Sequence, residues 1–464
     1  MNIAGRENSE IFPLNPPSNN RYSHKNGFPI VQFQIANQAK LLDPASLRLN
    51  GTFKLLAPTD TRATLTNTST VPVANSTTGI NVNNRVGVAS AIHQITLSTL
   101  SNQTLETVRS YGRYLASVNP VTHSQSDFDM TSQVANPGSA SRSFNGAHML
   151  NNEVAFSIPL RTGLLGGGNL IPLGQNGLRG MNVQLELTAD SSVISGYDHY
   201  SDTDVATQMI FNPPLAGAFY ELADLTLSYT LYVPDEDGVN KMSIPATGQL
   251  AYNSISQLYS VINSSDQTKV LNLGTTNTLS VMHNFIPTNQ INNYSFDSFS
   301  TGRLQNAGGL PGAPNNANLD RVTFIRGGSK FPLEYNIDVE DVGLENRPQT
   351  WNDVAFIDSI KPYRFFNHSL MSPYTQNGLV GTTTFDYTRS GRNKNTLPEP
   401  NKEVFGVGIN MDPLSKVGVD FLTTSYGIRL VSKLDNNNSP NSIFTYVRAR
   451  NVLSYSPAGI SVSS

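Results

Sequence analysis

The chain contains no cysteine, and only one of its 464 residues is a tryptophan. A chain without thiols cannot form a disulfide scaffold, a thiol nucleophile, a zinc finger or a cysteine-ligated cluster. These four classes are excluded at the outset, and stability must come from packed side chains and hydrogen bonds.

Charged residues are also scarce. They make up 14% of the chain, against roughly 25% in an average protein. The 31 Lys and Arg residues nearly balance the 34 Asp and Glu residues, giving a net charge of −3. A surface that binds nucleic acid by neutralising phosphates needs an excess of positive charge, so we expect no sequence-specific nucleic-acid binding. Asparagine, serine and threonine replace the missing charges, and asparagine alone is about a tenth of the chain.

Long apolar runs are absent as well. No stretch reaches the 18 or so apolar residues that a membrane-spanning helix needs, and residues 1–20 lack the apolar core of a signal peptide. We therefore expect neither a transmembrane segment nor a secretion signal. With 38% hydrophobic residues, including 18 Tyr and 21 Phe, the chain is nevertheless apolar enough to build a core.

Residues 1–27 differ from the rest because they combine three prolines with many polar residues. This composition predicts an extended N-terminal arm, which is either a disordered tail or a segment that becomes ordered on a neighbouring subunit.

From Phe28 onward, apolar and polar residues alternate with a period of two, as in antiparallel strands with one face on a core. The clearest segments are residues 31–35, 92–97, 183–187 and 225–233 in the first half, and residues 279–281, 322–324, 404–409, 428–430 and 444–446 in the second. The polar partners are mostly Thr, Ser, Gln and Asn, which cost less to bury against another subunit than charged residues.

Helical patterns are rare. Residues 103–118 carry one apolar stripe, formed by Leu105, Val108, Tyr111, Leu115 and Val118, and Pro120 is expected to end this helix. A shorter helix is expected over residues 349–360, between Pro348 and Pro362. Many strands with so few helices predict an all-β chain.

A break near residues 234–245 divides the chain into halves of similar size. Each half suits a jelly roll, which is eight strands in two facing sheets. We therefore predict two consecutive eight-stranded antiparallel jelly rolls with short helices and long loops. The arm spans residues 1–27, the first roll residues 28–235 and the second roll residues 236–464.

No catalytic, cofactor-binding or metal-binding residue is predicted. The seven histidines, at positions 24, 93, 123, 148, 199, 283 and 368, occur singly. His199 lies among Asp198, Asp202 and Asp204, but this segment lacks the glycine and distal glutamate of a calcium loop and favours a solvated loop. Glycosylation sequons carry no information in a chain so rich in Asn, Ser and Thr.

Other motifs also favour structural interpretations. The segment 163–168 is rich in glycine but lacks the Gly-Lys-Ser/Thr of a phosphate loop, so we expect a turn. Gly327 and Gly328 predict a tight turn or bulge between strands. The acidic residues Asp235, Asp237, Asp338, Glu340 and Asp341 resemble turn and strand-edge charges more than a hydrolytic pair. Arg448 and Arg450 share one strand face, which is expected to be solvated or salt-bridged.

Several stretches in order resemble the double jelly-roll major capsid proteins of small icosahedral DNA viruses, particularly polinton-like viruses and virophages. They are residues 41–51, 89–97 with 103–106 and 111–114, 156–163 with 183–187, 324–335, and 444–448 through Tyr455 and Gly459. The resemblance implies homotrimers with a pseudo-hexameric outline that tile a virion shell. It also implies penton and minor capsid proteins as partners, and assembly inside the host cell.

The residues alone leave other functions open. A carbohydrate- or receptor-binding fibre or adhesin could stack sugars on tyrosines such as Tyr197 and Tyr200, although fibres more often show short repeats. A glycoside hydrolase on a β-sandwich would need two suitably spaced carboxylates, and no pair stands out. The minor vertex (penton) protein is typically one jelly roll, so the second strand-rich half favours the major protein.

Overall fold

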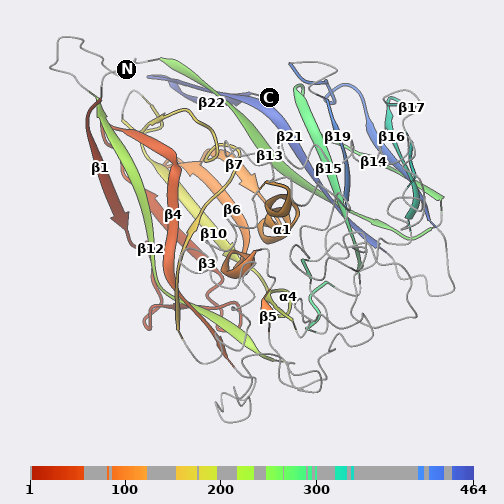
Figure 1. Ribbon diagram of the computed structural model, residues 1–464. Coiled ribbons are helices and arrows are strands. Elements are labelled where there is room, and N and C mark those ends of the chain that lie inside the picture. Colours follow the sequence, from red (N-terminus) through yellow and green to blue (C-terminus); the bar gives the residue numbers. More distant parts are fainter. Residues whose placement is uncertain are drawn as a thin grey trace, which may run out of the picture.

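In the computed structural model the chain forms two antiparallel β-sandwiches side by side (Figure 1). The structure describes residues 3–56, 81–82, 86–122, 153–174, 177–195, 217–234, 247–264, 266–288, 291–294, 298–299, 319–331, 336–338, 406–411, 417–432 and 441–463.

The first sandwich consists of two facing sheets, one of six strands and one of four. One sheet has the order β1 (Ile3–Ile11), β12 (Phe219–Pro234), β4 (Leu41–Leu56) and β8 (Val154–Pro159), with β2 (Arg21–Tyr22) on β12 and β9 (Ile171–Pro172) on β4. The other has the order β3 (Ile30–Ile35), β10 (Met181–Leu187), β6 (Ile92–Thr99) and β7 (Thr104–Val108). Short elements complete it: β5 (Asn81–Val82) paired with β11 (Ile194–Ser195), the 3-10 helix η1 (Gly87–Ala91), α1 (Tyr111–Thr122) and α4 (Asp190–Val193).

The second sandwich repeats this arrangement. One sheet has the order β13 (Gly248–Ile262), β21 (Asn441–Ser456), β15 (Thr278–Pro287) and β19 (Gly406–Asn410), with β22 (Gly459–Ser463) added to β21. The other has the order β14 (Asp266–Leu271), β20 (Tyr426–Ser432), β16 (Leu319–Arg326) and β17 (Ser329–Lys330), with β18 (Asn336–Asp338) on β16.

Numbering the eight principal strands of each sandwich in chain order gives the same result twice. One sheet has strands 1-8-3-6 and the facing sheet has strands 2-7-4-5. Consecutive strands lie in opposite sheets, except the fourth and fifth, which pair as a hairpin within one sheet, and this is the connectivity of a jelly roll. The predicted all-β chain with two eight-stranded jelly rolls is therefore confirmed.

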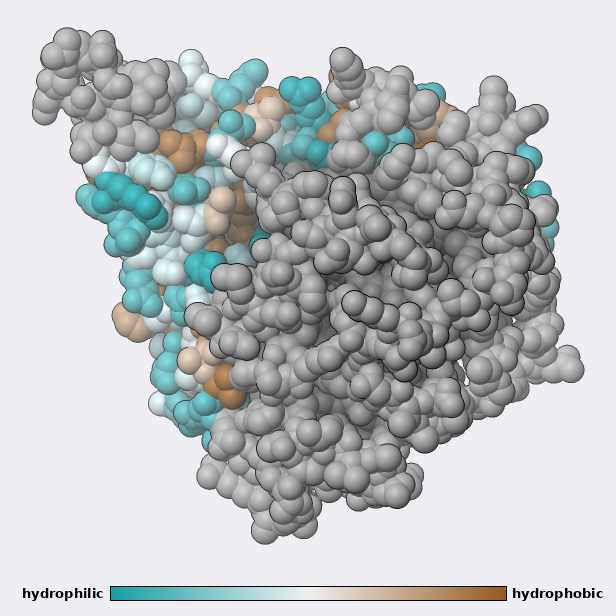
Figure 2. All heavy atoms as spheres, viewed as in Figure 1, coloured by the Kyte–Doolittle hydropathy of each residue, from teal (hydrophilic) through white to brown (hydrophobic). Residues whose placement is uncertain are grey.

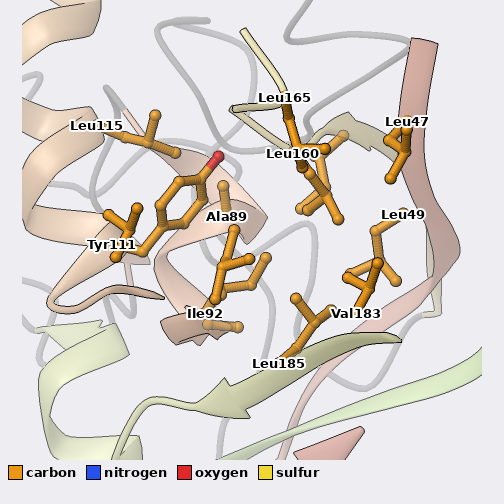
Figure 3. Close-up of a cluster of buried hydrophobic side chains, with 14 of the residues drawn as sticks. Leu47, Leu49, Ala89, Ile92, Tyr111, Leu115, Leu160, Leu165, Val183 and Leu185 are labelled. Atoms are coloured by element: carbon orange, nitrogen blue, oxygen red, sulfur yellow. The ribbon is translucent and has the colours of Figure 1, made fainter. Parts of the chain in front are cut away.

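The alternation seen in the sequence sets which side chains enter the core. In β10, every second residue is buried, and Val183 and Leu185 point inward. Figure 3 shows them near Leu47 and Leu49 of β4, which belongs to the facing sheet. A slip of one residue would turn these side chains to the opposite face, so the pattern fixes the register.

The structure corrects the helix predicted over residues 103–118. Its first part, Thr104–Val108, is strand β7, which pairs antiparallel with β6. The helix begins only at Tyr111, after Ser110 adopts a positive φ of 47° that breaks the regular backbone. Strand pairing outweighs the helical spacing of Leu105 and Val108. The helix also continues to Thr122 instead of ending at Pro120.

The N-terminal residues differ from the expected disordered or partner-ordered arm. Residues Ile3–Ile11 form strand β1, which pairs with β12 along most of its length. β1 supplies the first strand of the first jelly roll, so the extended segment completes a sheet of its own chain. The polar composition fits this position, because an edge strand has one open side.

Two predictions concerning glycine turns are confirmed. Gly327 and Gly328, with φ of 56° and 87°, form the turn between β16 and β17. The segment 163–168 is a turn followed by strand β9. The helix expected at residues 349–360 lies outside the described residues. In the part of the chain that the structure describes, no helix is long and apolar enough to cross a membrane.

Candidate functional site: the junction between the two sandwiches

The described residues contain no cluster of three or more potential metal ligands. His199 and its neighbouring aspartates, like His123, His148 and His368, lie outside the described residues, as do Asp235, Asp237, Glu340 and Asp341. Asp338 belongs to β18, which pairs with β16. A network of buried hydrogen bonds instead marks the junction where the two jelly rolls meet.

The junction joins β7 and α1 of the first sandwich to β13, β15 and β21 of the second (Figure 1). One hydrophobic cluster runs through the first sandwich and continues into the second. Its members from the second sandwich are Leu250, Tyr252, Ile255, Met282, Ile286, Phe299, Phe444, Tyr446 and Leu453. A shared apolar core of this kind holds two domains in a fixed relation.

Glu106 is the central polar residue of the junction. Its carboxylate accepts hydrogen bonds from the backbone N–H groups of Gly163 at 3.0 Å and Leu164 at 2.7 Å, both in the first sandwich. It accepts a third, at 2.8 Å, from the N–H of Ile255 on β13 in the second sandwich. One buried side chain thereby satisfies backbone donors from both jelly rolls.

Burial raises the pKa of the Glu106 carboxyl above its ordinary value of 4.5, although the hydrogen bonds from Leu164, Ile255, Thr162 and Gly163 act in the opposite direction. The folded chain therefore holds the proton more tightly than the unfolded chain. The stability that this linkage contributes is fully present below pH 4.5 and is lost as the pH rises through the raised pKa.

This linkage can be measured by comparison with Glu106→Gln, which keeps the size of the side chain but does not titrate. We expect the stability of the wild-type chain relative to this variant to fall as the pH rises from about 4 to about 8. Urea unfolding of both proteins across this range measures the difference. A difference that stays constant with pH would contradict the buried, proton-linked state of Glu106.

Two tyrosines of the second sandwich extend the junction. The Tyr252 hydroxyl donates to the carbonyl of Leu105 at 2.8 Å, and the Tyr446 hydroxyl donates to the carbonyl of Ser110 at 2.9 Å. Burial raises the pKa of both phenols, so both remain neutral hydrogen-bond donors. They fasten the start of β7 and the link between β7 and α1.

Removing one of these hydroxyls gives a further prediction. Tyr446→Phe should lower the free energy of unfolding by about 1 kcal/mol, because the ring packing remains while the Ser110 carbonyl loses its donor. Thermal unfolding measures the change. Tyr232→Phe, on the half-buried outward side of β12, is the control and should change stability by less than about 0.5 kcal/mol. Equal losses in the two variants would show that the junction hydroxyl has no special role.

Helix α1 contributes ring and amide contacts. The Arg113 guanidinium lies 4.2 Å from the centroid of the Phe444 ring, a cation–π distance. The rings of Tyr114 and Tyr446 have centroids 5.7 Å apart. The Asn284 side-chain amide on β15 donates to the Ser117 hydroxyl at 2.5 Å. The helix is thus held by side chains from two strands of the other jelly roll, β21 and β15.

His283 is the one described histidine that is fully buried, and it lies inside the second sandwich. Its ring nitrogens lie 2.8 Å from the Thr445 hydroxyl and 2.7 Å from the Tyr426 hydroxyl, and its ring stacks on Tyr426 and Phe324. Burial lowers its pKa to about 3, so it is a neutral link between the two sheets. His24 is exposed, and burial lowers the pKa of His93.

Arg448 and Arg450 share one face of β21, as predicted. This is the face that carries Phe444 and Tyr446 toward the first sandwich. Arg450 is exposed, whereas Arg448 is half-buried and its charge acts on the phenol of Tyr114. Arg448 therefore belongs to the junction, which differs from the solvated or salt-bridged face expected from the sequence, whereas Arg450 is exposed.

Sequence reasoning did not single out Glu106, which it assigned to the first turn of a helix. A signal was present, because Glu106 is an isolated acid between Leu105 and Val108, in a chain poor in charge. Its three backbone donors lie 57, 58 and 149 positions away along the chain. Contacts between residues so far apart in the sequence are set by the topology of the fold. The pattern alone could not reveal it.

Comparisons with known proteins support the fold assignment. No protein-family model matches the sequence, and no curated protein matches it. Solved structures do match. VP54 of PBCV-1, fitted into a reconstruction of the virophage Sputnik, has a TM-score of 0.56 and 11% identity, over 100% of this chain and 98% of that chain. The 3.5 Å structure of the Sputnik virophage gives 0.55 and 9%, over 100% and 89%.

The Faustovirus major capsid protein is also similar, with a TM-score of 0.55 and 9% identity, over 98% of this chain and 91% of that chain. Each match extends over nearly the whole length of this chain and of the matched chain, so it covers both jelly rolls and their relative placement. The resemblance inferred from the sequence is confirmed at the level of the fold: the chain has the double jelly-roll fold of this lineage of major capsid proteins.

Proposed function

We propose that this chain is the major capsid protein of an icosahedral virus, with a structural role and no enzymatic activity. The observation that carries the proposal is the pairing of two complete jelly rolls through a buried junction. A rigid double unit suits a building block, whereas an enzyme needs a pocket with converging reactive groups. The full-length likeness to capsid proteins supports the same role.

We further propose that the chain assembles as a homotrimer with a pseudo-hexameric outline and is located in the virion shell, beside penton and minor capsid proteins. Two jelly rolls per chain give six per trimer, and large sheet faces are available for contacts between copies. The alternative penton role is disfavoured, because that protein typically has one jelly roll. The boundary between the rolls at residues 235 and 236 stays a prediction, whereas the first roll already includes strand β1 and so begins before residue 28.

Light scattering during size-exclusion chromatography tests the proposal. We expect a particle of about three times the 50.4 kDa chain mass, and negative-stain images should show six-lobed plates or closed shells. The mass should not change with reducing agents, since the chain has no cysteine, nor with chelators, since no metal site is predicted. A stable monomer at micromolar concentration would refute the capsid role as stated.

A further inference from the structure

The two sheets of the second sandwich are held in place in different ways. The sheet β13-β21-β15-β19 has apolar contacts on both of its faces. On one face Val281 and Val447 point into the core of the second sandwich, and on the other face Met282 belongs to the cluster shared with the first sandwich. This sheet is therefore anchored twice.

The facing sheet, β14-β20-β16-β17, has one such contact. Its buried apolar side chains that the structure describes all belong to the core of the second sandwich. In Figure 1 its strands β14, β16 and β17 lie on the side of the molecule away from the first sandwich, and Figure 2 shows hydrophilic residues at this margin. Its outward side carries the exposed ion pair of Arg429 and Asp266. Attachment of this sheet therefore depends on the core between the two sheets.

His283 is a polar link across this core. It lies on β15, is fully buried, and has its Nδ1 atom 2.8 Å from the hydroxyl of Thr445 on β21, in its own sheet. Its Nε2 atom lies 2.7 Å from the hydroxyl of Tyr426 on β20, in the facing sheet. The imidazole ring also stacks on Tyr426 and on Phe324 of β16. One imidazole thus joins the doubly anchored sheet to the singly anchored one.

This environment disfavours a charged imidazole. Among the described side chains of the core, β13, β14 and β19 contribute aliphatic groups, β21 contributes the Thr445 hydroxyl, and β20 contributes the Tyr426 phenol, whose pKa is raised by burial. Arg326 reaches the core from the end of β16, with its guanidinium 5.6 Å from the centroid of the Phe421 ring, and its positive charge opposes a second one. Burial lowers the pKa of His283 to about 3.

The sign of the linkage follows from this pKa. The ordinary value is 6.5, so any opening that lets water reach the ring allows His283 to take up a proton. The stability that neutral His283 provides is fully present above pH 6.5 and is lost as the pH falls toward 3. Glu106 responds in the opposite direction, because burial raises its pKa and acid therefore stabilises the junction. Acid thus weakens the interior of the second sandwich and not its attachment to the first.

We propose that protonation of His283 releases the sheet β14-β20-β16-β17, while the sheet β13-β21-β15-β19 stays attached to the first sandwich. The released sheet loses the one core that covers its apolar face. A sheet without a covered apolar face does not keep its strands paired, so its backbone N–H groups become accessible to solvent. This acid response is a property of the single chain, and it goes beyond the structural role proposed above.

Hydrogen–deuterium exchange of the full-length chain, followed by mass spectrometry of its peptides, tests the inference. The opening constant of each segment is obtained by correcting for the pH dependence of intrinsic exchange. For peptides that cover β16 and β20, we expect this constant to rise about fifteenfold from pH 6.5 to pH 5, which is the effect of one buried histidine. Peptides from β6, β10 and β13 should change by less than about threefold. Most carboxyl groups titrate below this range.

Two matched variants identify the group responsible. His283→Gln keeps a side chain that donates and accepts hydrogen bonds but does not titrate, so the response of β16 and β20 should fall below about threefold. His93→Gln makes the same change in the first sandwich. His93 is half-buried, and burial lowers its pKa while Glu186 acts in the opposite direction. This control should leave the response of β16 and β20 unchanged.

Three results would overturn the inference. Equal responses in the wild-type chain and in His283→Gln would mean that another group takes up the proton. A response of the same size in β6 and β10 would mean that the whole chain opens together, and one in β13 would mean that the two sheets of the second sandwich do not separate. If His283→Gln does not fold, the wild-type chain decides, because an opening constant of β20 that stays the same from pH 6.5 to pH 5 also refutes the proposal.

Discussion

Glu106→Ala should lower the free energy of unfolding by about 3 kcal/mol, the larger part of which comes from unsatisfied backbone donors. The carboxylate accepts from the N–H groups of Gly163, Leu164 and Ile255. Without it, these three buried groups lose their partner, and the methyl group of alanine leaves a cavity between the sandwiches. Alanine also removes the free-energy cost of burying the carboxylate, and this offsets part of the loss. The expected loss of stability is therefore smaller than the sum of three separate hydrogen bonds.

Equilibrium unfolding in urea measures this loss, and Glu7→Ala is the matched control. Glu7 is an exposed residue on β1 whose carboxylate lies 2.6 Å from the Lys40 ammonium group. A surface ion pair contributes little, so the control should change stability by no more than about 1 kcal/mol. If Glu106→Ala behaves like Glu7→Ala, the carboxylate does not hold the junction together, and the apolar cluster alone does.

The sequence predicts the strands well where one face is buried. Val183, Leu185 and Leu187 alternate with polar residues, and that pattern fixes both the strand and its inward face. The repeated connectivity and two-lobed architecture could also be anticipated, because a break in the pattern near residue 234 separates two strand-rich halves.

Two features of the fold depend on contacts between distant residues. Strand β1 has little apolar patterning of its own, and it becomes a strand because the open edge of β12 offers a ladder of backbone partners. Strand β7 carries a helical spacing, but β6 provides the same kind of partner. In both cases tertiary pairing outweighs local preference, and such pairing cannot be read from one segment.

The junction was the least predictable part. Its apolar members, such as Phe444 and Tyr446, have the same pattern as core residues, so the sequence cannot tell a sandwich interior from an interface between sandwiches.

Gly163→Ala should lower the free energy of unfolding by about 3 kcal/mol, because it inserts a methyl group into a tight contact between the sandwiches. A Cβ at this position would lie 2.0 Å from the backbone carbonyl oxygen of Asn253, on β13, and 2.6 Å from Glu106 Oε1. No real Cβ contact is that short, and the atoms it meets are backbone and a fixed carboxylate. The two sandwiches would have to separate, which would also lengthen the hydrogen bonds of Glu106.

The same turn provides the control. Gly168→Ala lies five residues further on, in an exposed position with no atom within 4 Å of its added Cβ. Replacing glycine there should be neutral, or should stabilise by up to about 1 kcal/mol through the lower entropy of the unfolded chain. Urea unfolding of both variants measures the difference. The added methyl group is identical in both variants. A large loss of stability at position 163 alone would therefore show that close packing across the junction requires glycine there, and that the loss of glycine flexibility is not the cause. If the two variants change stability equally, the sandwiches can move apart at little cost. The two sandwiches would then not form the fixed unit that the proposed role in a shell requires.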